Sequence, residues 1–183
     1  MKDIINIVCD EGATSRVVIG SVEENFESLL PGGTPRIIIV TDAKVHANNL
    51  AFVNAHEHIV IGQGESSKTF VKLEEVYRQL LHMGADRSTF IVGMGGGIVT
   101  DVTGFVASTY MRGVRFGFLP TTLLAQVDAS IGGKNGVNLD GYKNIIGVFN
   151  QPEFVLCDPE LLSSLPDREF RAGLAEAVKA AVI

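Results

Sequence analysis

Short apolar segments alternate with helix-length segments along most of this chain. Strands are predicted at 15–20, 36–42, 58–62, 88–97, 114–122 and 154–159, and helices at 21–30, 66–84 and 98–113. The segment RIIIVTD at 36–42 is hydrophobic on both faces, as buried parallel strands are. Repeated strand–helix units predict an α/β fold with a mainly parallel sheet and helices on both of its faces.

Composition limits the classes of protein to which the chain can belong. Its 183 residues are enough for one domain, and 46% hydrophobic residues can form a core. The net charge of −6 argues against a nucleic-acid surface, although it permits a local basic pocket. We expect no membrane span, since no apolar run reaches about 18 residues. The start MKDIINIVCDEGATS lacks the pattern of a signal peptide, so we expect a cytoplasmic protein.

Two segments near the C-terminal end depart from the strand–helix pattern. Residues 128–144, DASIGGKNGVNLDGYKN, are rich in Gly and Asn and predict a long functional or disordered loop. The last residues, FRAGLAEAVKAAVI, predict an amphipathic helix that has no Gly or Asn cap. Glu176 and Lys179 lie three residues apart, so they share one face of this helix.

The stretch GMGGGIVTD, from Gly93 to Asp101, is the first candidate binding element. Consecutive glycines between a strand and a helix let a ligand approach the backbone, and the helix N-terminus beyond them favours a pyrophosphate. The pattern is not G-x-G-x-x-G, because Ile98 occupies the last position. Its place at the end of a strand still favours a binding loop over a plain tight turn.

Acidic residues follow two of the predicted strands. Asp42 could accept hydrogen bonds from ribose hydroxyls or could simply cap a helix, and the residue types leave these alternatives even. Because Asp42 precedes the glycine loop, the strand order must differ from that of the usual dinucleotide fold. Glu65 and Lys68 would lie close together on a first helical turn, where a capping acid and a solvated lysine are the simpler interpretation.

Three cationic residues, an aspartate and an asparagine lie in or near the glycine-rich segment. They are Arg112, Asp128, Lys134, Lys143 and Asn144. Surface lysines are normally just solvated, but a turn-rich segment with little apolar content could fold around an anion such as phosphate.

The remaining metal-ligating and nucleophilic residue types carry little signal. The four histidines, His46, His56, His58 and His82, are expected at the surface or at strand edges. Cys9 and Cys157 are expected to be reduced and partly buried thiols.

Four blocks of the sequence together resemble one enzyme family. They are GGGIVTDVTGFVASTYMRG, PTTLLAQVDASIGGKNGVN, GYKNIIGVFNQP and LPDREFRAGLAEAVK. In this order they are similar to 3-dehydroquinate synthase, of the sugar phosphate cyclases, from about residue 35 to the end. The resemblance implies a Rossmann-like NAD-binding α/β domain at 1–160 and, at 161–183, the start of a C-terminal helical metal-binding domain that is otherwise missing.

The resemblance also implies roles for individual residues. The positions that match NAD-binding residues are Asp42, Glu65, Lys68, Gly95, Gly96, Gly97, Asp101, Thr121, Thr122 and Ser164. Asp128, Lys134, Lys143, Asn144 and Lys179 match the active-site pocket, with Lys134 and Asn144 on the substrate phosphate.

Two further residues matched by the family imply a metal and a partner. Arg112 matches an arginine that reaches the neighbouring subunit's phosphate site, which implies a homodimer. Glu176 matches one of three ligands of a Zn²⁺ (or Co²⁺) ion. The two histidine ligands of the family have no counterpart among this chain's histidines.

The implied reaction converts 3-deoxy-D-arabino-heptulosonate 7-phosphate to 3-dehydroquinate and phosphate in aromatic amino-acid biosynthesis. NAD oxidises the substrate transiently, phosphate is eliminated, the hydride returns, and an aldol step closes the ring. We expect this chain alone to be inactive, because one carboxylate does not make a catalytic zinc site. The alternatives are another sugar phosphate cyclase, an iron- or zinc-dependent polyol dehydrogenase of the same fold, and a non-catalytic NAD-binding module.

Overall fold

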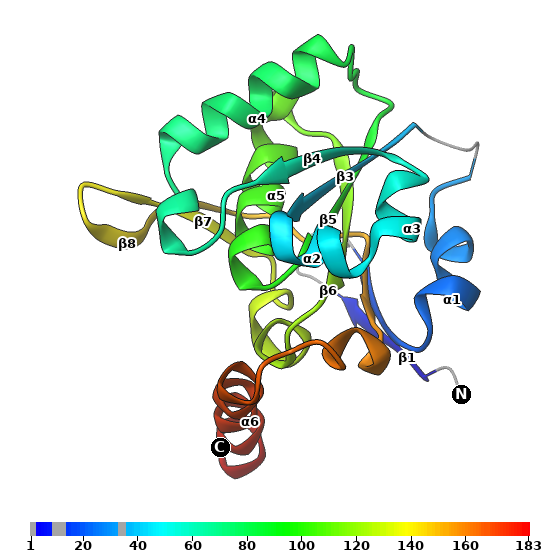
Figure 1. Cartoon of the computed structure of the whole chain (residues 1–183), viewed down its shortest axis with the longest axis vertical. Helices are drawn as coiled ribbons and strands as arrows, with labels where there is room; N and C mark the ends of the chain where they lie inside the picture. The colour runs from blue at the N-terminus through cyan, green and yellow to red at the C-terminus, as the bar shows by residue number, and fades with distance from the viewer. Residues whose placement is uncertain (1–2, 9–13, 33–35) are drawn as a thin grey trace.

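The computed structural model describes residues 3–8, 14–32 and 36–183 and contains a seven-stranded sheet (Figure 1). The sheet order is β1-β2-β9-β6-β5-β3-β4. The strands are β1 (Asp3–Val8), β2 (Thr14–Ile19), β3 (Ile37–Asp42), β4 (Glu57–Ile61), β5 (Phe90–Gly95), β6 (Arg115–Pro120) and β9 (Phe154–Cys157). All neighbours pair in parallel except β1, which is antiparallel to β2. The predicted mainly parallel α/β sheet is confirmed.

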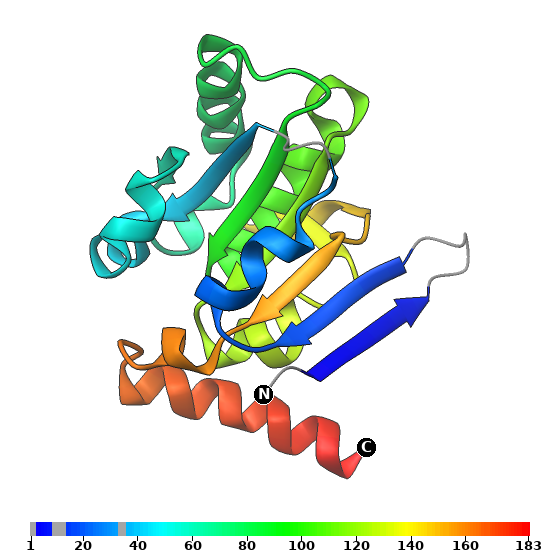
Figure 2. The same cartoon turned by 90° about the vertical axis from the view of Figure 1, so that its right-hand side faces the viewer.

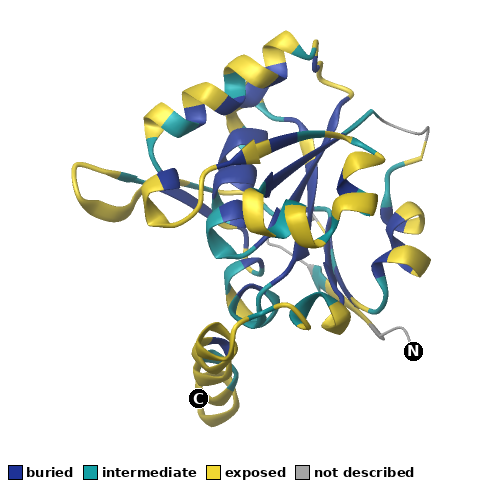
Figure 3. Cartoon of the chain, viewed as in Figure 1, coloured by how far each residue is buried: buried dark blue, intermediate teal, exposed yellow. Residues whose placement is uncertain are grey.

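Helices cover both faces of the sheet. One face packs on α4 (Phe70–His82) and α5 (Gly97–Thr109), and the other packs on α1 (Val22–Leu29) and α3 (Leu50–Asn54). Successive side chains of β3 point to opposite faces of the sheet. Ile38 and Val40 therefore join the core under α5, while Ile39 joins the core under α1. Buried residues are therefore concentrated in the strands and in α5 (Figure 3).

Helices α4 and α1 are capped in different ways. Thr69 is the N-cap residue of helix α4, and its hydroxyl accepts from Lys72 N. Gly84 follows the C-terminal end of the helix and has a φ of +70°. Ala85 N donates to Leu80 O at 2.9 Å, which is the bond of a Schellman motif. Ser21 is the N-cap residue of α1, but its side chain makes no cap bond. The Asp158 carboxylate fills that role, accepting from Val22 N at 2.8 Å.

The chain first adds parallel strands toward one edge of the sheet and then, after returning to the centre at β5, toward the other edge. From β3 the chain moves outward to β4, and from β5 it moves the other way to β6 and β9. In chain order these five strands read 2-1-3-4-5, the flavodoxin-like arrangement, whose ligands bind outside the carboxyl ends at the reversal. The prediction that Asp42 before the glycine loop requires an unusual strand order is confirmed. The fold therefore points to the crevice between Asp42 and Gly95.

Residues 128–144 do not form the predicted long loop. They contain the end of a short π-helical turn, η3 (Ala125–Ala129), then β7 (Lys134–Leu139) and the start of β8 (Tyr142–Phe149). Strands β7 and β8 form a separate antiparallel hairpin that projects at one side of the molecule (Figure 1). The hairpin packs on α5 where Gly104 lets it approach: a Cβ there would lie 1.7 Å from Asn135 Oδ1.

The predicted terminal helix is present as α6 (Asp167–Val182). It runs along the side of the molecule on which the parallel strands end (Figure 2). Gly173 is its one buried residue, because a Cβ there would come within 2.6 Å of Leu123 and Leu124. The rest of α6 is mostly exposed (Figure 3). Among the described residues, no helix is long and apolar enough to cross a membrane.

Candidate cofactor and phosphate-binding site

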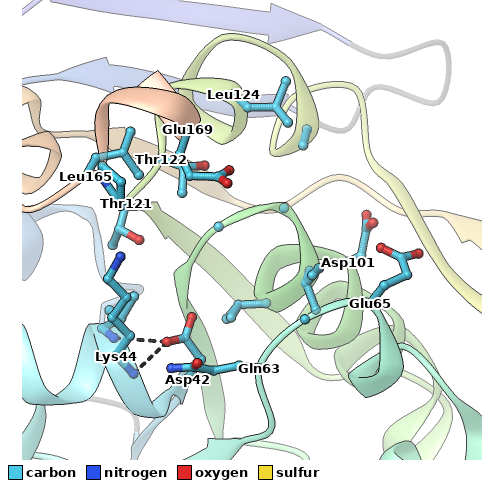
Figure 4. Close-up of a pocket in the computed structure, with 18 of the residues that line it drawn as sticks. Asp42, Lys44, Gln63, Glu65, Asp101, Thr121, Thr122, Leu124, Leu165 and Glu169 are labelled. Atoms are coloured by element: carbon cyan, nitrogen blue, oxygen red, sulfur yellow. Dashed lines mark hydrogen bonds between the residues drawn. The ribbon is translucent and has the colours of Figure 1, made fainter. Parts of the chain in front are cut away.

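A cavity of about 600 Å³ opens at the strand reversal. Four strand ends contribute to its wall: Asp42 at the end of β3, Gly62–Glu65 after β4, Gly96–Ile98 after β5, and Thr121–Thr122 after β6. The loop before α6 closes one side with Ser164–Pro166 (Figure 4). Its volume lies in the usual range for small-molecule sites, roughly 300–1,000 Å³. We call this space the first cavity.

The glycine loop forms one wall of the first cavity and leads into α5. Gly96 is the N-cap residue of α5, and no side chain caps this helix end. The N-terminus of α5, with its partial positive charge, therefore forms part of the cavity wall. Side chains at the glycines would not fit: a Cβ at Gly96 would lie 3.0 Å from Thr122, and one at Gly97 would lie 3.2 Å from Ala129. Gly95 is buried beneath, where a Cβ would meet Val99 at 2.4 Å. The loop is therefore shaped for close approach to an anionic ligand.

Asp42 caps a helix, one of the two alternatives that its sequence context left open, and its place in the cavity wall is compatible with the other. Its carboxylate caps α2 (Ala43–Asn48), accepting from Lys44 N at 2.9 Å and from Val45 N at 3.0 Å (Figure 4). Both bonds use Oδ1, and Asp42 also lines the first cavity. The cap thus fixes the carboxylate, and Oδ2 is left to accept from a ligand hydroxyl.

Lys68 is buried rather than solvated, so the simpler interpretation of this residue is wrong. Its Nζ forms an ion pair with Asp101 on α5 and donates to Asn144 Oδ1 at 2.5 Å. Burial raises the pKa of the Asp101 carboxyl, and the ion pair with Lys68 opposes that rise. The cluster joins the turn η1 (Glu65–Ser67), α5 and the hairpin.

A second cavity, of about 480 Å³, lies between α5 and the hairpin. Asp128, Lys134 and Asn144 line it, together with backbone at Gly136 and Gly147. Asp101 lines both cavities. A cation, an amide and glycine backbone around one space suit a phosphate-sized anion.

Lys143 and Arg112 are among the predicted site residues that line neither cavity. Lys143 is exposed on β8, next to Asn144, and lines neither space. Arg112 is exposed on the turn η2 (Tyr110–Arg112), where its φ is +70°. The structure therefore does not bring these two side chains together with Lys134.

Glu176 and Lys179 form an ion pair along one face of α6, as their spacing predicts. The hydrogen bond from Lys179 to Glu176 raises the pKa of the Lys179 ammonium, and the Asp128 carboxylate adds to the rise. Helix α6 also contacts η3, the turn that carries Asp128. Among the described residues, no group of three His, Cys, Asp or Glu side chains is placed to hold a metal ion. The present donor set does not fit a zinc ion.

Comparison with known proteins agrees with this geometry. The model of the 3-dehydroquinate synthase N-terminal family matches residues 58–172, which is more than half of the chain. The chain belongs to the 3-dehydroquinate synthase family. The 3-dehydroquinate synthase of Solibacter usitatus is 44% identical over 181 residues, covering 96% of this chain and 50% of that protein. The enzyme of Rhodospirillum rubrum is 46% identical over 81% of this chain and 41% of its own length. The chain thus spans about half the length of these relatives.

Solved structures of related cyclases share the fold. A 2-deoxy-scyllo-inosose synthase complexed with carbaglucose-6-phosphate, NAD⁺ and Co²⁺ superposes with a TM-score of 0.86 at 29% identity, covering 97% of this chain and 51% of that one. The 2-epi-5-epi-valiolone synthase of Streptomyces hygroscopicus, with NAD⁺ and Zn²⁺ bound, has a TM-score of 0.75 at 31% identity, covering 87% and 47%. An iron-containing alcohol dehydrogenase at 17% identity, with a TM-score of 0.70, shares the fold alone.

In this member of the 3-dehydroquinate synthase family, the residues matched to NAD lie together in space. Nine of the ten positions matched to NAD line the first cavity, and Gly95 lies beneath it. Sequence reasoning missed Lys44 and Asn48 on α2, which also line it. Their position in the helix that Asp42 caps was the available signal.

Proposed function

We propose that this chain is the NAD-binding part of a 3-dehydroquinate synthase, which converts 3-deoxy-D-arabino-heptulosonate 7-phosphate to 3-dehydroquinate and phosphate. The observation that carries the proposal is the shared wall of the two cavities. Residues matched to the cofactor line one space, residues matched to the substrate phosphate line the next, and Asp101 lines both. A cofactor and a phosphate ester bound there would lie side by side.

The first cavity fits a dinucleotide. The glycine wall accepts no side chain, the N-terminus of α5 favours the pyrophosphate, and Asp42 offers an oriented carboxylate oxygen for a ribose hydroxyl. Hydride transfer to and from the nicotinamide is the chemistry that bound NAD supplies. The protein's part is to hold the reacting carbon of the substrate next to it.

The residues of the second cavity have separate tasks in the proposal. Lys134 and Asn144 bind the phosphate, so that the ester is held in one geometry during elimination. Lys68 orients Asn144 and compensates the charge of Asp101. The proposal assigns proton transfer to the ionisable groups of Asp128 on η3 and Lys179 on α6.

The proposal assigns Glu176 a metal-ligand role only in the complete protein. The described residues offer no further ligand group, so we derive no step through a metal ion. We expect this chain alone to show no turnover. Phosphate release by the chain above that of its Glu176→Ala variant would contradict this expectation.

The proposal extends to organisation and partners. Residues 1–160 form the NAD-binding domain, and 161–183 begin a helical domain. Arg112 lines neither cavity and is exposed, which supports a role in the phosphate site of a second subunit of a homodimer. A cytoplasmic location and a small sugar phosphate substrate complete the assignment.

Sequence identity favours this reaction over those of other cyclases. Relatives at 41–52% identity are 3-dehydroquinate synthases, whereas the two cyclase structures of other specificity are 29% and 31% identical. The dehydrogenase alternative rests on fold alone.

Phosphate release by the protein that the complete gene encodes tests the assignment. With NAD present, we expect release from 3-deoxy-D-arabino-heptulosonate 7-phosphate and none from glucose 6-phosphate, with loss of most activity in Lys134→Met. Release from glucose 6-phosphate alone would indicate another cyclase, and net NADH formation from glycerol would indicate a polyol dehydrogenase. Either result would contradict the proposal.

A further inference from the structure

Asn138 connects the wall of the first cavity to the wall of the second. Its side-chain Nδ2 donates to Glu65 Oε1 at 2.7 Å, and its Oδ1 accepts from Asn144 N at 2.8 Å. Its backbone N–H donates to Lys68 O at 2.8 Å. Glu65 and Lys68 line the first cavity, and Asn144 lines the second. One half-buried amide therefore contacts three residues of the two sites.

The hairpin is irregular at this position. The pairing of β7 with β8 shifts between Val137 and Leu139, whose partners are Ile146 and Tyr142. Asn138 thus faces a bulged stretch of β8 instead of one paired residue, and it forms a bridge with Thr69. Bulges of this kind turn a side chain away from the ladder and are common beside active sites.

Asn144 lies in the bulged stretch and has a left-handed backbone, with φ of +52°. Non-glycine residues adopt this region at a cost, so a fixed contact must hold it. The bond from Asn144 N to Asn138 Oδ1 is such a contact. In this conformation the Asn144 side chain accepts from Lys68 while lining the second cavity.

We propose that Asn138 is a positioning residue that couples the two cavities, by holding the Glu65 carboxylate on the cofactor side and the Asn144 amide on the phosphate side. This inference rests on the proposed function for the chemistry of the two ligands. The contact with Glu65 crosses from the hairpin to the turn before α4, so it contributes nothing to the internal pairing of the hairpin. A residue that only stabilised the hairpin would need no such bond.

The test is NADH affinity of the 183-residue chain, measured by fluorescence titration. We expect Asn138→Ala to weaken binding about fivefold, which corresponds to the roughly 1 kcal/mol that one ordinary hydrogen bond contributes. Asn138→Asp sets two carboxylates against each other and should weaken it at least as much. Glu65→Gln alone measures the direct effect of losing that carboxylate on NADH binding. Adding Glu65→Gln to Asn138→Asp exchanges donor and acceptor, so the doubly substituted chain should bind NADH about as tightly as the Glu65→Gln chain. A residue with only a structural role would show no such rescue.

Asn150→Asp is the matched control, because Asn150 lies at the base of the same hairpin, bonds Ser108 and lines neither cavity. It should bind NADH like the unsubstituted chain. Equal affinity in all Asn138 variants, or no rescue by Glu65→Gln, would overturn the inference while leaving the proposed function intact. No NADH binding by the unsubstituted chain would contradict the proposed function, and the inference with it.

Discussion

At the scale of single residues, the outcome for Lys68 shows the limit of local sequence reasoning. A lysine after GQGES looks solvated, but its ion-pair partner lies 33 residues further on and its amide partner 76 residues further on. For Asp42 the local sequence was sufficient to predict the helix cap, and the same carboxylate also lines the first cavity. Residue types therefore indicated which groups matter, but only the fold could show which of them become buried partners.

Substitution of Lys68 should destabilise the protein in a pH-dependent way. In Lys68→Met the Asp101 carboxylate is left half-buried and unpaired, so we expect a loss of about 3 kcal/mol in the free energy of unfolding at pH 7. Burial raises the folded-state pKa of Asp101, so the ionised group costs stability above that pKa, and the cost vanishes below the unfolded value of about 4. The loss should therefore shrink as the pH falls toward 4, as urea unfolding across this range would show.

Two comparisons control that measurement. Lys72→Met breaks an exposed pair with Glu75 and should change stability by at most about 0.5 kcal/mol. Adding Asp101→Asn to Lys68→Met removes the unpaired charge and should restore part of the stability. A pH-independent loss in Lys68→Met would contradict the account of this pair.

Cys157 provides a second prediction at this scale. The thiol is buried at the end of β9, and burial raises its pKa to about 12. Because the thiolate is the reactive species, Cys157 should resist iodoacetamide at pH 8 and react only after unfolding. The measurement uses a Cys9→Ser variant, which leaves Cys157 as the one thiol. Rapid labelling of that folded variant would be inconsistent with the burial described. Cys9 itself lies outside the described residues.

At the scale of elements, the alternation of apolar segments was enough to predict the central strands and α4, α5 and α6. The hairpin β7–β8 escaped because Gly and Asn rarely mark strands. Its strands are instead stabilised by packing on α5 at Gly104 and by bonds within the hairpin region, where Asn135 donates to Gly133 O and Asn150 O, both at 2.9 Å. Strand β1 and helices α2 and α3 were also missed. Helices α2 and α3 are six and five residues long, too short for a periodic signal.

Helix α5 and the hairpin should tolerate no side chain between them at Gly104. Gly104→Ala would drive a methyl group against Asn135, which cannot move without breaking its two bonds. We expect a loss of about 1–3 kcal/mol, measured by urea unfolding. Gly32→Ala is the control, because a Cβ there meets nothing within 4 Å. Equal stability of the two variants would show that the hairpin does not pack closely on α5.

At the scale of the whole molecule, the strand reversal explains why distant motifs form one site. Parallel strands bring Asp42, Gly96 and Thr121 to the same edge of the sheet, although they span 80 residues of sequence. The resemblance to a family supplied the roles of these residues, and the topology shows how they reach one cavity. What the sequence did not predict is the contact of the hairpin with this edge, through which the second cavity adjoins the first.

The central claim is that the first cavity binds NAD, and an NMR titration of the ¹⁵N-labelled chain with millimolar NAD tests it most directly. Backbone amides of Gly64, Gly96 and Gly97 should shift with saturation, while those of Gly32 and Gly113, which do not line that cavity, should stay in place. Unchanged Gly96 and Gly97 resonances at millimolar NAD, or shifts confined to residues away from the ends of β3 and β5, would contradict the claim.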